Sequence, residues 1–111
     1  MPSKKTEPAA LEFGSGNVFA DLGLPAADKL KIKSGLVFEI TRAIRNQQLS
    51  QAEAGRRMGI AQPKVSAMMR GDFANLSERK LMDCLTRLGY DIEIKVTPAA
   101  EQVGQLLLSI A

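Results

Sequence analysis

The stretch from Ser50 to Gly71, SQAEAGRRMGIAQPKVSAMMRG, constrains the fold more than any other part of the chain. Ser50 and Glu53 have the spacing of a capping box, in which the two side chains satisfy the free amides at the start of a helix. Gly59 follows Met58 and can adopt the left-handed backbone that closes a helix. Because apolar residues then recur at helical spacing, the sequence predicts two short helices joined by a tight glycine turn.

The spacing of small and apolar residues supports a helix-turn-helix in this stretch. Gly55 supplies the small residue that is needed where two short helices cross closely, although glycine inside a helix costs about 1 kcal/mol relative to alanine. The apolar seam between the two helices is expected to consist of Met58, Ile60, Val65 and Met68. In a helix-turn-helix the second helix enters the major groove of DNA, so the motif indicates a nucleic-acid-binding protein.

Further helices are predicted on both sides of the motif. Before it, residues 26–48 have apolar side chains at steps of three and four, which predicts a long amphipathic helix. After it, Ser77 can cap a helix that ends at Gly89. Near the N-terminus, residues 17–23 are expected to form one helical turn.

The C-terminal part is predicted to contain a strand and a helix. Residues 90–96 alternate between apolar and polar side chains, which is typical of a strand with one apolar face, made of Tyr90, Ile92, Ile94 and Val96. Pro98 ends this strand, and the apolar residues beyond it predict a terminal helix. Since no second convincing strand is present, we expect residues 90–96 to pair antiparallel with the same strand of a second copy. Addition of a toxin strand, or of residues 12–24, to the same edge is the alternative.

Together these elements predict a mainly α fold, with five helices and one C-terminal β-strand that pairs across a dimer. The expected organisation is an N-terminal arm with one short helical turn (1–24), a DNA-binding domain with the dimerisation strand (25–97) and a C-terminal helix (98–111). A chain of 111 residues is long enough for one domain with a single core.

The cysteine and histidine content excludes several kinds of chemistry. The chain has one cysteine and no histidine, which leaves no internal disulfide, no zinc finger and no histidine-based acid–base catalysis. Cys84 lies among apolar residues at helical spacing and is expected to be a buried, unreactive thiol. We find no nucleophile–base pair, metal cluster or phosphate loop in the sequence. We therefore expect no enzymatic activity, no cofactor and no metal site.

The positive charge belongs to the middle of the chain. Residues 42–90 contain nine Lys/Arg and four Asp/Glu, giving +5, whereas the rest contains six and eight, giving −2, which together make the net charge of +3. A separate basic segment is typical of nucleic-acid binders, and a solvated surface is the alternative on charge alone.

The sequence also bears on the compartment. No apolar run approaches the roughly 20 residues that span a bilayer. Two lysines near the N-terminus are not followed by the apolar segment of a secretory signal. We therefore expect a cytoplasmic protein.

The motif and its flanks resemble a known family. LSQAEAGRRMGIAQPKVSAMMRG is similar to the Cro/CI-type helix-turn-helix of phage repressors and XRE regulators, with matches at Leu49, Gln51, the pair Ala52 and Glu53, Gly59, Val65 and Gly71. This resemblance covers residues 36–89. The flanks GNVFADLGLP and GYDIEIKV resemble the HigA-type antitoxins within this family, which are partners of RelE-like toxins. The resemblance implies a Cro/CI-like fold and a sequence-specific repressor, and at the finer level an antitoxin that represses its own operon.

The motif departs from the family pattern at three positions. The family usually has Ser or Thr at the position of Ala61, Leu at that of Ala54 and Ala at that of Gly55. Since Ala61 forgoes a cap worth about 1 kcal/mol, we expect a soft motif that packing or dimerisation stabilises. The family register makes Ala61 the N-cap of the second helix and Pro63 a first-turn residue, where proline removes no hydrogen bond. Proline disfavours helical geometry in the residue before it, which favours Gln62 as the N-cap instead.

The resemblance and the helical geometry predict which side chains meet DNA. With Val65 inward and a rotation of about 100° per residue, the following side chains point outward or to the flanks: Gln62, Pro63, Lys64, Ser66, Ala67 and Arg70. Gln62 can hydrogen-bond an adenine edge, and Lys64 and Arg70 can contact guanine or phosphate. Pro63 and Ala67 can offer apolar contact to a thymine methyl. Gln51 corresponds to the phosphate-binding glutamine of the family.

The resemblance also implies the partners. Such proteins bind paired half-sites as dimers, so we expect a homodimer on a pseudo-palindromic double-stranded operator. A RelE/HigB-like toxin is the second partner that the finer resemblance implies. There are two alternative functions: a stand-alone phage-type repressor, or a toxin-neutralising interaction module with weak DNA binding. The basic residues of the motif favour a DNA-binding repressor over the interaction module.

Overall fold

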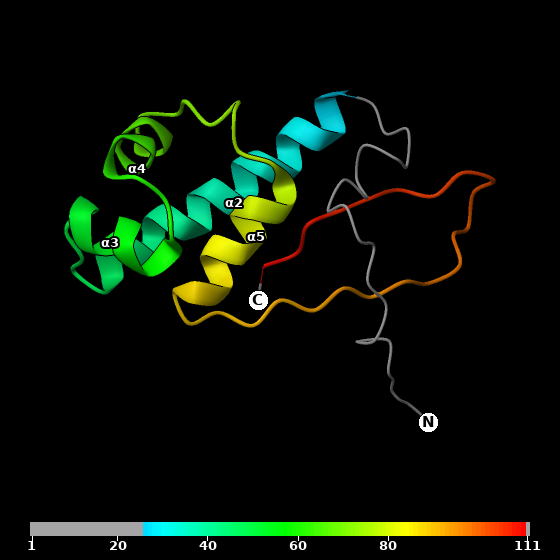
Figure 1. Ribbon diagram of the computed structural model, residues 1–111. Coiled ribbons are helices and arrows are strands. Elements are labelled where there is room, and N and C mark those ends of the chain that lie inside the picture. The colour runs from blue at the N-terminus through cyan, green and yellow to red at the C-terminus, as the bar shows by residue number, and fades with distance from the viewer. Residues whose placement is uncertain (1–25, 111) are drawn as a thin grey trace.

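The computed structural model describes residues 26–110, which contain four helices (Figure 1). Their bounds are α2 (Ala26–Asn46), α3 (Gln51–Met58), α4 (Gln62–Met69) and α5 (Glu78–Arg87). Each helix that the sequence predicts between residues 26 and 89 is therefore present. The helical turn predicted at 17–23 lies outside the described residues, as does the arm to which it belongs.

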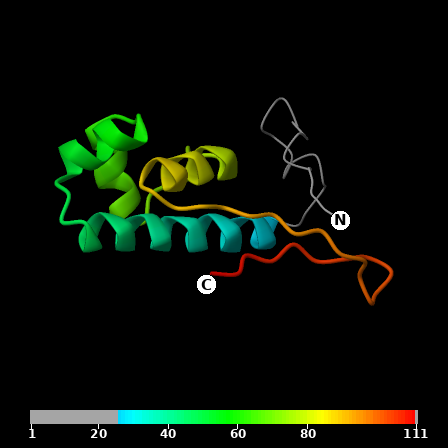
Figure 2. The ribbon, with the colours of Figure 1, turned by 90° about the horizontal axis from the view of Figure 1, so that it is seen from below.

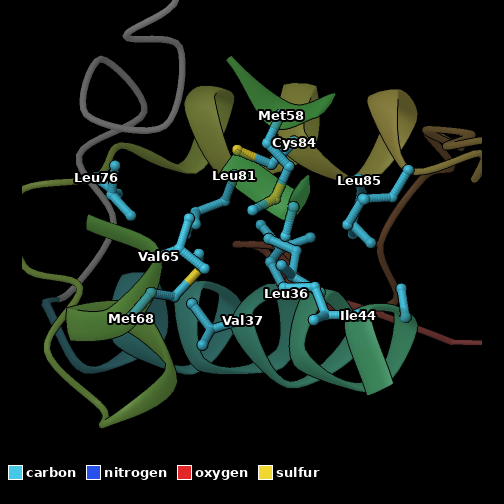
Figure 3. Close-up of a cluster of buried hydrophobic side chains, with 14 of the residues drawn as sticks. Leu36, Val37, Ile44, Met58, Val65, Met68, Leu76, Leu81, Cys84 and Leu85 are labelled. Atoms are coloured by element: carbon cyan, nitrogen blue, oxygen red, sulfur yellow. The ribbon is translucent and has the colours of Figure 1, made fainter. Parts of the chain in front are cut away.

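The helices surround one aliphatic core. α5 packs along α2, while α3 and α4 pack against each other at the end of this pair (Figures 1 and 2). Figure 3 shows side chains from all four helices meeting between them. The largest fully buried side chains are Ile40, Ile44, Met58, Val65, Met68, Leu81 and Cys84. Because one core joins α3 and α4 to the long helix α2, the motif is held on a rigid base.

The helix starts follow the predicted caps. The Ser50 hydroxyl accepts a hydrogen bond from the Glu53 N–H at 3.1 Å, and the Ser77 hydroxyl accepts one from the Lys80 N–H at 3.0 Å. Only half of the capping box at Ser50 is formed, because the Glu53 carboxylate pairs with Arg56 and Arg57 instead of turning back to the helix start.

The strand predicted for residues 90–96 is not formed within the described part of the chain. The Tyr90 N–H still donates to the Leu85 carbonyl at 3.1 Å, but no backbone hydrogen bond joins residues 91–110 to another described residue. Tyr90 and Ile92 are half-buried, whereas Ile94 and Val96 are 68% and 89% exposed. The segment is extended but has no neighbour to pair with, and a strand exists only as part of a sheet.

The prediction of a helix at 98–111 is wrong for residues 98–110, which are irregular and extended. The described residues thus give four helices where five were expected. A short isolated helix is marginal without packing, and Gly104 in the middle of this one weakens it further. The chain instead turns beyond the helices and returns toward α2 (Figures 1 and 2). There the Leu108 side chain covers Gly35, so that a Cβ on Gly35 would lie 2.6 Å from Leu108 Cδ2.

No helix in the range 26–110 has the length and apolar character needed to cross a membrane.

Candidate nucleic-acid interface

The turn between α3 and α4 is fixed by its backbone. Gly59 closes α3 with φ 74° and ψ 29°, a left-handed conformation that favours glycine. The N–H groups of Gly59 and Ile60 both donate to the Gly55 carbonyl, at 2.8 and 3.0 Å. A Cβ on Gly55 would lie 2.7 Å from the Ile60 carbonyl oxygen and 3.4 Å from Val65 Cγ2. The close crossing predicted at Gly55 is confirmed, and it involves the backbone of the turn itself.

The inward face of α4 anchors this helix in the core. Val65 and Met68 are 0% and 1% exposed, and Met58 of α3 is also fully buried. Figure 3 shows these three side chains within the same cluster. Ile60 is partly buried against it, so the predicted seam is confirmed. Since α4 has only eight residues, these contacts determine which of its side chains face outward.

The start of α4 follows the family register. Ala61 is the N-cap with φ −68° and ψ 146°, and it makes no side-chain cap. Gln62 is the first helical residue and Pro63 the second. The alternative in which Gln62 caps the helix is therefore wrong. Pro63 lies within the first turn, where a missing N–H costs no intrahelical hydrogen bond.

The structure brings the predicted contact residues of α4 together on one side. Four of them are exposed: Gln62, Pro63, Lys64 and Arg70. The other two, Ser66 and Ala67, are half-buried beside them. Arg70 Nη1 donates to Ser66 Oγ at 2.6 Å, which holds the guanidinium along the outward side of the helix.

The basic residues of the motif differ in their charge partners. On α3, Arg56 and Arg57 both pair with the Glu53 carboxylate. α4 carries no acidic residue, and neither Lys64 nor Arg70 forms an ion pair with another residue in the described range. The motif is therefore positive on both helices: Glu53 offsets only one of the two arginine charges of α3, while Lys64 of α4 and its C-cap Arg70 have no acidic partner in the described range.

Gln51 is the first residue of α3 and is half-buried. Its Nε2 lies 3.9 Å from the sulfur of Met69, a weak contact that places this side chain beside the last turn of α4. Gln51 thus joins the α4 residues at the same side of the molecule. The first-turn amides of α3 nearby favour an anion.

One part of this surface was missed by the sequence reasoning. A shallow hollow lies between α4 and the loop that follows it, lined by Lys64, Ala67, Asp72, Phe73, Asn75 and Leu76. The loop begins at Gly71, with φ 95°, and the Asp72 N–H then donates to the Ala67 carbonyl at 2.9 Å. This hydrogen bond is the helix-closing contact of a Schellman motif. Gly71 is a signal from which the position of Asp72 could have been predicted.

Cys84 is fully buried in the core, as expected from its spacing. Burial raises the pKa of its thiol, an effect that the nearby Lys80 only partly opposes. A buried neutral thiol packs as a small apolar group.

Comparison with known proteins agrees with this geometry. A family model described as "Helix-turn-helix domain" matches residues 18–97. A solved chain named "Putative XRE Family Transcriptional Regulator" superposes with a TM-score of 0.69 at 32% sequence identity, covering 78% of this chain and 98% of that one. No curated protein matches the chain.

Proposed function

Because this chain belongs to the helix-turn-helix domain family and to the XRE-family transcriptional regulators, we propose that it is a repressor that reads an operator through α4. The observation that carries this proposal is the outward side of α4, which is basic, free of acidic residues and anchored by the buried Val65 and Met68. A positively charged helix fixed on a rigid core is suited to the major groove.

Each outward side chain has a proposed role. Gln62, at the exposed tip of α4, hydrogen-bonds an adenine edge, while Lys64 and Arg70 contact guanine or phosphate. Pro63 and Ala67 offer apolar surface to a thymine methyl. Ser66 orients Arg70 through their 2.6 Å hydrogen bond. Gln51 contacts a phosphate together with the first-turn amides of α3.

We further propose that two copies bind the operator together. One short recognition helix gives few base contacts, and a dimer doubles them on paired half-sites. Residues 90–96 are extended, have no backbone partner from 91 onward in the described range and expose Ile94 and Val96. Antiparallel pairing of this segment with its copy satisfies the backbone groups and covers the apolar side chains.

The finer proposal is a cytoplasmic antitoxin that represses its own operon. It is supported by the resemblance of residues 16–25 and 89–96 to the flanks of HigA-type antitoxins. The partner would be a RelE/HigB-like toxin, and its test is co-purification with the product of the adjacent reading frame. Absence of a stable complex when both proteins are co-expressed leaves the alternative of a stand-alone repressor.

The DNA-binding proposal is tested by titrating the full chain onto duplex DNA from upstream of its own gene, at several salt concentrations. The logarithm of the affinity should fall linearly with that of the salt concentration, with a slope of about −0.9 per phosphate neutralised. Affinity for the upstream DNA should exceed that for a random duplex by roughly a thousandfold or more. Equal affinity for the two duplexes would rule out a sequence-reading role on this DNA.

A further inference from the structure

The hollow beside α4 holds an acidic residue on an otherwise basic side of the molecule. Asp72 is the one acidic residue between Ala54 and Ser77. It lines the hollow together with Lys64 and Ala67 of α4. The Asp72 side chain is therefore next to the residues that the proposed function directs toward DNA.

The position of Asp72 is set by the structure around it. Its N–H is bonded to the Ala67 carbonyl at 2.9 Å, which ties it to the last turn of α4. Further along the loop, Leu76 is buried in the core, and Lys33 Nζ donates to the Ala74 carbonyl at 3.2 Å. Both ends of the short segment that carries Asp72 are thus attached to helices.

Nothing in the described part of the chain uses the Asp72 carboxylate. It is exposed, and it forms neither an ion pair nor a side-chain hydrogen bond with another described residue. It does not cap α5 either, since Ser77 does so and Glu78 occupies the first turn. An acidic group at this place would be expected to weaken phosphate binding, because like charges repel.

We propose that Asp72 is a specificity-determining residue that accepts a hydrogen bond from the N4 amino group of a cytosine in the major groove. This inference rests on the proposed function of α4. A carboxylate is an acceptor only, and cytosine N4 is the donor that Asp and Glu recognise at base edges. Phosphate groups have no hydrogen-bond donor to offer the carboxylate. On DNA without the cytosine, the Asp72 carboxylate therefore only repels the phosphates and weakens binding. Asp72 thereby lowers the affinity for non-specific DNA and adds one recognised base to each half-site.

The test is selection of bound sequences from a randomised duplex pool by the full-length wild type, Asp72→Asn and Glu101→Gln. The substitution Asp72→Asn keeps the shape of an exposed side chain, and circular dichroism checks its fold. Glu101→Gln removes the same charge from an exposed position beyond Pro98. Figure 1 shows the segment that follows Pro98, in orange, on the other side of α2 and α5 from α4. Wild type and Glu101→Gln should both select a cytosine at one position of each half-site.

Asp72→Asn should reduce the preference for that cytosine by roughly tenfold and bind random duplex a few times more tightly. The base positions that α4 reads should stay the same. Replacing the selected cytosine by thymine, which has no amino group, should weaken the wild type more than Asp72→Asn, because the neutral amide is a weaker acceptor for the cytosine N4 amino group and can donate to the thymine O4.

An unchanged cytosine preference in Asp72→Asn overturns the inference and leaves the proposed function intact. If the wild type selects no sequence at all, the proposed function fails as well. The two failures are therefore distinguishable.

Discussion

Gly55 and Ile60 approach each other so closely that a Cβ on Gly55 would lie 2.7 Å from the Ile60 carbonyl oxygen. The obstructing atom belongs to the backbone of the turn, which cannot move aside without changing the angle between α3 and α4. Glycine is therefore required here for packing, although alanine is the better helix former. The orientation of α4, and with it the proposed reading surface, depends on this contact.

Gly55→Ala should lower the free energy of unfolding by about 1–3 kcal/mol, because the overlap outweighs the gain in helix propensity. Gly35→Ala is the matched control, since Gly35 is also inside a helix. There a Cβ would meet only the far end of the Leu108 side chain, which can rotate away. Gly35→Ala should therefore be neutral or stabilising by up to about 1 kcal/mol. Urea denaturation of both variants measures the difference, and equal effects at the two sites would contradict a packing requirement for glycine at position 55.

The uncapped start of α4 offers a stabilising substitution. Ala61 already has the extended backbone of an N-cap but no side-chain acceptor. Ala61→Ser should raise the free energy of unfolding by about 1 kcal/mol, and Ser77→Ala should lower it by a similar amount. Thermal denaturation of the two variants tests both signs. A loss of stability in Ala61→Ser would show that the N-cap of α4 is not at residue 61.

Cys84 should be chemically inert in the native protein. Burial raises the pKa of its thiol, so the reactive thiolate is scarce at neutral pH, and the side chain is fully buried. Alkylation by iodoacetamide at neutral pH should be slow and should become fast in denaturant. Since ionisation is favoured in the unfolded chain, alkaline conditions above the ordinary thiol pKa should destabilise the fold. Equal labelling rates in native buffer and in denaturant would contradict the burial of this residue.

Much of the helical domain could be predicted because its signals are local. Ser50, Gly59 and Ser77 fix helix ends through contacts with their own neighbours in sequence, so the bounds follow from the residue types. The core face of α4 follows from the spacing of Val65 and Met68 alone. The sequence did not predict that the Glu53 carboxylate pairs with Arg56 and Arg57 instead of the free amide at the helix start. This choice depends on which arginine rotamers reach the carboxylate.

The C-terminal part could not be predicted because its signals depend on partners outside the segment. The alternation in residues 90–96 is a genuine strand pattern, but a strand forms only where another lies beside it. The apolar residues after Pro98 fit a helix equally well until the contact between Leu108 and Gly35 is known. Asp72 differs in this respect, because the turn that places it beside Ala67 is signalled locally by Gly71, so its position could have been predicted.

In the proposed dimer, substitutions on the apolar face of residues 90–96 should affect the association of the two copies. In sedimentation at micromolar concentration the wild type should be a dimer. Ile94→Lys should give a folded monomer, because it places a charge in the apolar face that pairing would cover. Glu93→Lys introduces the same side chain on the opposite face of the segment and should leave the dimer intact. A monomeric wild type would contradict this mode of pairing.

A role of the α4 tip in reading bases can be separated from general DNA affinity by one pair of variants and two duplexes. The affinities of the wild type and Gln62→Ala are measured on the operator and on a random duplex at the same salt concentration. Gln62 is exposed and lies outside the core, so the variant should fold normally. If Gln62 reads a base, Gln62→Ala should lose about 1–3 kcal/mol of binding free energy on the operator and almost none on the random duplex. An equal loss on both duplexes, or no loss on either, would contradict this role.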